Sequence, residues 1–320
     1  LLDNLTTSII MVSLTRKFIA DKKDRWFFLG MVVIAANAGG AWSPIGDVTT
    51  TMLWIGEQIT TVQVISQLII PSFVCLIVPL SVMSLKVKGK FIRPETDLME
   101  TSHHTSASQR NLVFFCGLGG LIFVPVFKSI THFPPFMGMM LSLGFLWLLT
   151  DIIHRNDVKD ERKYFSAFHA LERMDVPTLL FFLGILLAVG SLQSAGHLGE
   201  MAIYLEKSIG TDTSNGVYAI GFIIGLLSAI VDNVPLVAAA IGMYPLEGSG
   251  FFEQDGLFWQ FLAYCAGTGG SALIIGSAAG VAIMGLEKIP FFWYVRKISF
   301  YALIGYICGA ITYIFQMMFL

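Results

Sequence analysis

Five long stretches of this 320-residue chain consist almost entirely of apolar side chains. A stretch of about 20 such residues, once helical, is long enough to cross the hydrocarbon core of a bilayer. Only 13% of the residues are charged, about half of the share in a typical soluble domain. The sequence therefore predicts an all-α polytopic membrane protein that has the lipid bilayer as its solvent. The continuous spans are expected at 63–84, 112–127, 135–153, 177–195 and 298–320.

Four further apolar stretches are interrupted by polar and glycine-rich residues. They cover residues 1–15, 26–57, 215–244 and 258–285. Irregular backbone at membrane depth is tolerated only where it is packed in protein or lines a cavity. The interruptions are therefore the places where a functional site is expected.

The basic residues indicate which loops share a side of the membrane. All of the 20 Lys and Arg residues except Lys128 and Lys207 fall in four loops, and such loops are typically cytoplasmic. These loops are 16–25, 86–111, 154–173 and 286–297. The other loops, 57–62, 128–134, 196–214 and 245–257, are expected outside. The stretch 154–176 is interpreted as an interfacial helix.

Segment 215–244 has an outside loop on both flanks, so it must enter and leave the membrane on the same face. We therefore predict a re-entrant helical hairpin whose tip includes Asp232, Asn233 and Pro235. The segments 26–57 and 258–285 are predicted to be broken membrane helices.

Two motifs occur twice in the chain at nearly the same spacing. The pair Asp3-Asn4 matches Asp232-Asn233 at an offset of 229. The glycine-rich break at 37–47 matches 267–277 at an offset of 230. Interrupted segments at matching positions of inverted repeats mark the binding site of secondary transporters.

We accordingly predict two inverted repeats. Residues 1–85 form the remainder of the first repeat, with a hairpin exit arm, the broken helix 26–57 and the helix 63–84. Residues 86–111 form a polar cytoplasmic linker. The second repeat, 112–320, contains scaffold helices within 112–195, the hairpin 215–244, the broken helix 258–285 and the helix 298–320. A counterpart of roughly 112–231 is expected to precede Leu1 in the full protein.

Three carboxylates, Asp3, Asp47 and Asp232, fall at interrupted positions inside the membrane. An ionised carboxylate there is costly unless it holds a cation or takes a proton. Competition between the two would couple their movement. No Lys, Arg or His lies in these breaks, and the neighbouring oxygen atoms suit a hard cation such as Na+ or Li+.

The predicted cation- and proton-binding residues combine these carboxylates with nearby amides and hydroxyls. Ser, Thr and Gly in membrane helices more often serve packing, so the carboxylates are the strongest candidates. The set is Asp3, Asn4, Thr6, Thr7, Asn37, Ser43, Asp47, Thr49, Asp232, Asn233, Thr268, Ser271 and Ser277. The residues predicted to break the helices are Gly39, Gly40, Pro44, Gly46, Pro235, Gly269, Gly270 and Gly276.

Four segments together resemble the NhaD-type sodium/proton antiporters of the ion transporter superfamily. They are DNLTT at 3–7, NAGGAWSPIGDVTT at 37–50, DNVP at 232–235 and GTGGS at 267–271. The superfamily also contains arsenite and dicarboxylate carriers as distant relatives. The resemblance implies exchange of Na+ or Li+ for H+ across the cytoplasmic membrane, a homodimer formed through scaffold helices, and a mobile transport domain.

Two other functions remain as alternatives. A Na+-coupled organic anion carrier of the same superfamily is disfavoured, because Asp at both hairpin tips would repel a dianion. An intramembrane aspartyl protease is a remote alternative that would need two carboxylates in one site, and Pro44 stands where its motif has Gly. The sequence predicts no enzyme activity, no resident cofactor and, given a net charge of -2, no nucleic-acid partner.

Overall fold

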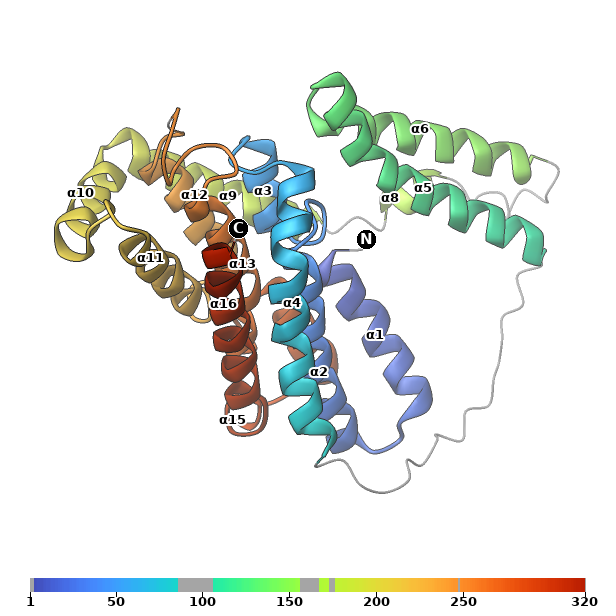
Figure 1. Cartoon of the computed structure of the whole chain (residues 1–320). Coiled ribbons are helices and arrows are strands. Elements are labelled where there is room, and N and C mark those ends of the chain that lie inside the picture. Colours follow the sequence, from blue (N-terminus) through green and yellow to red (C-terminus); the bar gives the residue numbers. More distant parts are fainter. Residues whose placement is uncertain (1–2, 86–105, 156–166, 173–175, 247, 320) are drawn as a thin grey trace. The chain divides into compact units, whose positions relative to one another are not determined.

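The computed structural model describes residues 3–85, 106–155, 167–172, 176–246 and 248–319. These residues are overwhelmingly helical, as the sequence predicts (Figure 1). Their contacts divide the chain into two compact units, Asp97–Leu183 and the combination of Leu2–Thr96 with Gly184–Leu320.

The first unit contains the helical hairpin formed by α5 (Ala107–Thr131) and α6 (Pro135–Ile153). A capping box between Ser106 and Gln109 begins α5, so the last residues of the predicted linker 86–111 are helical. The rest of that linker lies outside the described residues. Of the predicted interfacial helix 154–176, the structure describes the short α8 (Ala167–Glu172) in its centre.

The second unit contains two sets of helices in the same order. The first set is α1 (Asn4–Phe18), α2 (Lys22–Ala41), α3 (Val48–Ile55) and α4 (Thr61–Ser84). The second is α12 (Asn233–Met243), α13 (Leu257–Gly269), the 3-10 turn η1 (Gly270–Ala272), α14 (Ala278–Glu287), α15 (Phe291–Tyr294), the π-helical η2 (Val295–Ser299) and α16 (Phe300–Phe319).

Both broken helices and the hairpin occur where the sequence predicts them. The breaks separate α2 from α3 and α13 from α14, and the hairpin is made by α11 (Ser214–Leu227) and α12. The helix α9 (Val176–Ser194) matches the predicted span 177–195. Four described stretches are long and apolar enough to cross a membrane: Thr61–Ser84, Ser108–Thr131, Pro135–Ile153 and Phe291–Phe319.

The sequence predicts a loop at 196–214, and this prediction is largely wrong because most of the segment forms the helix α10 (His197–Ile209). This helix is amphipathic and begins and ends at Gly196 and Gly210, both of which have positive φ. Its three charged residues lower its mean hydropathy below that of a membrane span. The charges therefore made the sequence of this helix resemble a loop, although the helix packs against the hairpin arm α12.

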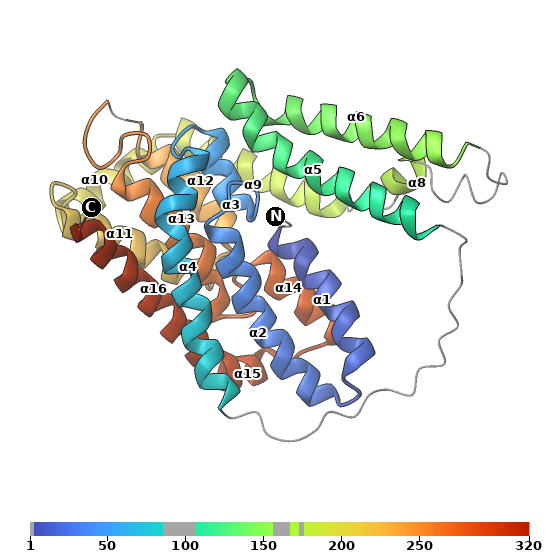
Figure 2. The same cartoon turned by 45° about the vertical axis from the view of Figure 1, so that its right-hand side comes forward.

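The two sets of helices pack across each other in a matched way. Helix α1 packs on α14, and its counterpart α12 packs on α3 (Figure 2). The long helices α4 and α16, one from each set, form the most extensive helix pair of the unit. Helices α1 and α12 therefore each contact the second half of the other set's broken helix, which brings the two breaks together.

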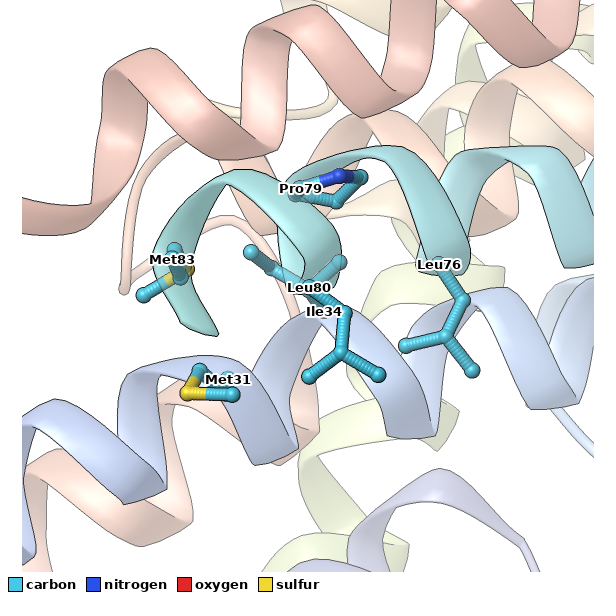
Figure 3. A pocket seen from close by; sticks show the side chains of 6 residues that line it. All are labelled: Met31, Ile34, Leu76, Pro79, Leu80 and Met83. Atoms are coloured by element: carbon cyan, nitrogen blue, oxygen red, sulfur yellow. The ribbon is translucent and has the colours of Figure 1, made fainter. Parts of the chain in front are cut away.

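Small residues allow α16 to approach α4 closely. A Cβ atom at Gly305 would lie 3.0 Å from Pro79 Cγ, and one at Gly309 would lie 2.6 Å from Pro71 O. Such glycines let membrane helices pack backbone to backbone. On its other side, α4 packs on α2, where Met31, Ile34, Leu76, Pro79, Leu80 and Met83 enclose a small apolar pocket (Figure 3).

Replacing Gly309 by Ala should lower the thermal stability of the protein in detergent. The added methyl group would strike Pro71 O and the hydroxyl of Tyr264, and such overpacking typically costs about 1–3 kcal/mol. Gly285→Ala is the matched control, because Gly285 is also helical and has no heavy atom within 4 Å of the added Cβ. Equal melting temperatures of the two variants would contradict the close α4–α16 packing.

Loops predicted to share a side of the membrane also meet in space. At one end, Asp255 accepts hydrogen bonds from the backbone N and the hydroxyl of Thr60 at 2.6 and 2.7 Å. At the other end, the buried carboxylate of Glu287 pairs with Arg16 and Arg25. The first contact joins loops 57–62 and 245–257, and the second joins 16–25 to the end of α14. Which end faces the cytoplasm stays a prediction.

Removing the charge of Glu287 should destabilise the second unit. Its side chain is only 2% exposed and carries both ion pairs, so Glu287→Gln leaves Arg25 partly buried without its carboxylate. The loss of a charged hydrogen-bond partner in such a place costs about 1–3 kcal/mol. Thermal unfolding measures this, with Glu200→Gln as the control because that carboxylate is 79% exposed. A control as unstable as Glu287→Gln would contradict the proposed stabilising role of the ion pairs of Glu287.

Candidate functional site

The two helix breaks are built around paired glycines. A Cβ at Gly40 would lie 2.6 Å from Gly46 O, and one at Gly270 would collide with Gly276 O. The chain can therefore fold back on itself only because these positions lack side chains. In the first break the backbone N of Ser43 donates to Gly40 O at 3.3 Å. Both breaks thus turn tightly and expose helix ends to the interior of the unit.

The first break delivers Asp47 to the start of α3. Asp47 is the N-cap residue of that helix, and it is only 2% exposed. Its Oδ2 atom accepts a hydrogen bond from the hydroxyl of Thr49 at 2.9 Å. The second break delivers Ser277 to the same place at the start of α14, where its Oγ accepts from Gly280 N at 3.3 Å.

The hairpin tip brings a second carboxylate to Asp47. Asn233 donates from Nδ2 to Asp47 Oδ2 at 3.0 Å, and the preceding Asp232 caps α12 by accepting from Asn233 N at 2.9 Å. Asp232 has a φ of 50°, a left-handed conformation that is strained for most residues. Asn233 thus contacts both carboxylates, Asp232 through its backbone N and Asp47 through its side chain. We call Asp47, Thr49, Asp232 and Asn233 the Asp47 cluster.

A second polar group connects α1 to the second break. Asn4 donates from Nδ2 to Asn37 Oδ1 at 3.1 Å. Asn37 in turn donates from Nδ2 to the hydroxyls of Ser271 and Ser277, both at 2.9 Å. All four residues are at most 2% exposed. We call Asn4, Asn37, Ser271 and Ser277 the Asn37 cluster.

Other predicted site residues have local roles. Asp3 caps α1 by accepting from Thr6 N at 2.7 Å, and within the described residues no hydrogen bond joins its side chain to Asp47. The side chain of Thr6 is exposed and that of Thr7 half-buried. Thr268 donates to Tyr264 O within its own helix at 2.7 Å.

Some of the predicted helix-breaking residues lie inside helices and not in the breaks. Pro44 lies in the first break as predicted, and its carbonyl accepts from the hydroxyl of Thr51 at 2.9 Å. Pro235 instead lies in the first turn of α12, where a missing N–H costs nothing. It therefore starts a helix and does not end one. Gly39 is the third residue from the C-terminal end of α2, and Gly269 is the last residue of α13.

Two buried hydroxyls near the site were not among the predicted site residues. Ser8 and Thr50 are 0% exposed, and neither hydroxyl has a hydrogen-bond partner among the described residues. Ser8 follows Asn4 by one helical turn, so both lie on one face of α1. That spacing could have identified Ser8 in the sequence. Thr50 lies in the first turn of α3, three residues after Asp47.

The Asp47 cluster has the chemistry of a site for a hard cation. It offers two carboxylates, an amide and a hydroxyl, the oxygen donors that such ions prefer. Among the described residues, no Lys, Arg or His forms an ion pair with Asp47 or Asp232. The carboxylates must therefore be neutralised by a proton or by an ion from solution.

Comparison with known proteins places this site in a family. A family model described as a citrate transporter matches residues 1–260. Sodium/proton antiporter 1 of Arabidopsis thaliana is 53% identical over 98% of this chain, and sodium/proton antiporter 2 of the same plant is 52% identical over the same share. The Na(+)/H(+) antiporter NhaD of Vibrio parahaemolyticus is 33% identical over 96% of the chain.

The chain covers 53%, 72% and 77% of these three relatives, so it spans about half the length of the first. Each of the three carries the name of a transporter and not of an enzyme. The remote alternative of an intramembrane protease is thereby overturned. A family match over most of the chain and antiporter relatives along nearly its whole length show that this multi-pass membrane protein belongs to the citrate transporter family and, within it, to the NhaD-type sodium/proton antiporters.

Proposed function

We propose that the protein exchanges Na+, or Li+, for H+ across a membrane, and that the ions compete for the Asp47 cluster. The observation that carries this proposal is the buried carboxylate of Asp47, which Thr49 and Asn233 hold and with which no basic side chain of the described residues forms an ion pair. A buried anion of this kind needs a cation or a proton at all times. Whichever one occupies the site excludes the other, which is the physical requirement for exchange.

The site is narrower in this proposal than in the sequence-based set. We assign Asp47, Asp232, Asn233 and Thr49 to the cation, together with Thr50, which lies in the first turn of α3. This proposal leaves Asn4, Asn37, Ser271 and Ser277 out of the cation site, and the other predicted ligands stay predictions. So do the homodimer and the assignment to the cytoplasmic membrane.

A carrier for organic anions is the second candidate, because the matching family model is described as a citrate transporter. The charge of the site opposes it. A dianion entering beside Asp47 and Asp232 would meet two carboxylates and no Lys, Arg or His paired with them among the described residues. Like charges held in a buried site repel strongly, so we expect no transport of citrate.

The test uses the protein in everted membrane vesicles that are acidified inside and contain a quenched pH dye. Addition of Na+ or Li+ should cause proton efflux and recovery of fluorescence, and K+ and choline serve as controls. Uptake of radiolabelled citrate is measured in the same vesicles. Citrate uptake without any response to Na+ or Li+ would overturn the proposed function in favour of the anion carrier.

A further inference from the structure

The Asp47 cluster and the Asn37 cluster occupy equivalent places in the two sets of helices. Positions 37, 41 and 47 of the first broken helix correspond to 267, 271 and 277 of the second, each at an offset of 230. Asn37 donates to Ser271 and to Ser277. A Cβ at Gly267 would lie 3.0 Å from Ala41 Cβ and 3.5 Å from Asp47 Oδ2. The contacts of residue 37 with positions 271 and 277 are thus repeated by the equivalent residue 267 with positions 41 and 47.

The same positions carry different chemistry in the two clusters. Beside Asp47, position 267 is glycine and position 41 is alanine, and within the described part of the chain the carboxylate is hydrogen-bonded by the side chains of Thr49 and Asn233. In the other cluster, position 277 is a neutral serine and position 37 is an asparagine. The Asp47 cluster is anionic and has a glycine at position 267. The Asn37 cluster is neutral and has the side chain of Asn37 at the equivalent position.

The amide of Asn37 is fully engaged. Its Nδ2 group has two N–H bonds, and each has a serine hydroxyl oxygen at 2.9 Å. Its Oδ1 accepts from Asn4 at 3.1 Å. The partly positive NH2 group therefore points at the two oxygens that a cation in this place would otherwise bind.

We propose that each chain has a single cation site, at Asp47, and that the equivalent second site is permanently closed by the side chain of Asn37. This inference rests on the proposed function and adds the number of sites to it. A cation entering the Asn37 cluster would have to displace an amide with three hydrogen bonds and would find no carboxylate there. Displacing the amide would leave its N–H groups without partners, which is costly, so the amide keeps the two serine oxygens even though Asn4 Oδ1 has no hydrogen-bond partner among the described residues.

The number of bound ions tests the proposal directly. Equilibrium binding of radioactive Na+ to the purified full-length protein in detergent, at a pH high enough to deprotonate the site, should saturate at one Na+ per chain with a Hill coefficient of about 1. Saturation at two Na+ per chain would overturn the single-site inference while leaving the exchange function intact. Absence of any saturable binding would instead overturn the proposed function on which the inference rests.

Substitutions in the Asn37 cluster distinguish a purely structural role of this cluster from a role as a second ion site. Ser271→Ala removes one of the hydroxyls that Asn37 binds and should leave one Na+ per chain, with a Kd within about threefold of the unsubstituted protein. Loss of binding in this variant would show that Ser271 holds the ion, against the inference. Ala41→Ser is the matched change on the Asp47 side, where a hydroxyl beside Gly267 and Asp47 should alter the Kd more than Ser271→Ala does.

A gain of binding provides the complementary test. The double substitution Asn37→Gly with Ser277→Asp copies Gly267 and Asp47 into the second cluster and should raise the binding to two Na+ per chain. A stably folded double variant that still binds one Na+ would contradict the idea that Asn37 and the missing carboxylate close this site. Ser271→Ala keeps the inference testable should the double variant fail to fold.

Discussion

Asp47→Asn should reduce Na+-driven proton efflux from vesicles by at least about 100-fold. The substitution preserves the size of the side chain at the N-cap position of α3, where Asp47 makes no side-chain capping hydrogen bond. It removes the charge that the side chains of Thr49 and Asn233 hold in place. A hundredfold loss corresponds to about 2.7 kcal/mol, a modest share of what a buried carboxylate can contribute to holding a cation.

The matched control for this variant is Asp21→Asn. Asp21 is also an N-cap residue, at the start of α2, where it accepts hydrogen bonds from Lys23 N and Asp24 N. Its side chain is exposed, so we expect efflux within twofold of the unsubstituted protein. If Asp47→Asn retained full exchange, Asp47 would not be the residue for which Na+ and H+ compete.

Asp232→Asn should change how Na+ transport depends on pH. Na+ binds the ionised carboxylates and a proton binds the same groups, so the apparent KM for Na+ should rise as the pH falls. With Asp47 and Asp232 both titrating in the site, the limiting slope of log KM against pH approaches −2. With Asp232 replaced, one titrating carboxylate remains, and the slope should approach −1 with a KM raised about tenfold at neutral pH.

Asp3→Asn is the matched control for Asp232→Asn, because Asp3 holds the equivalent N-cap position of α1. Its carboxylate accepts from Thr6 N, a bond that an Asn side chain can replace. We therefore expect the slope of −2 to persist in Asp3→Asn. A slope that fell equally in both variants would place Asp3 at the ion site, as the sequence alone predicts.

The broad fold could be predicted from the sequence because each element has a local signal. Apolar length identified α4 and α6 almost to the residue, and polar interruptions located both breaks and the hairpin. The amphipathic helix α10 was missed because charges at its surface resemble those of a loop. The π-helical segment η2 before α16 also has no such signal.

The candidate site was only partly predictable, since motif spacing does not say which side chains meet. The two copies of the break suggested that Asp3, Asp47 and Asp232 act together, yet the structure brings Asn233 to Asp47 and engages Asp3 in capping α1. Asn37 was predicted as a ligand, whereas three hydrogen bonds occupy it. Such pairings depend on how α1 and α12 cross to the opposite break.

The most direct test of competition at Asp47 is proton release from the purified full-length protein in weakly buffered detergent solution. NaCl is added at a pH where the site is partly protonated, and a pH dye records the change. We expect saturable proton release with Na+, none with K+ or choline, and none with Na+ in Asp47→Asn. Na+ binding without proton release, or undiminished release from Asp47→Asn, would contradict exchange at this carboxylate.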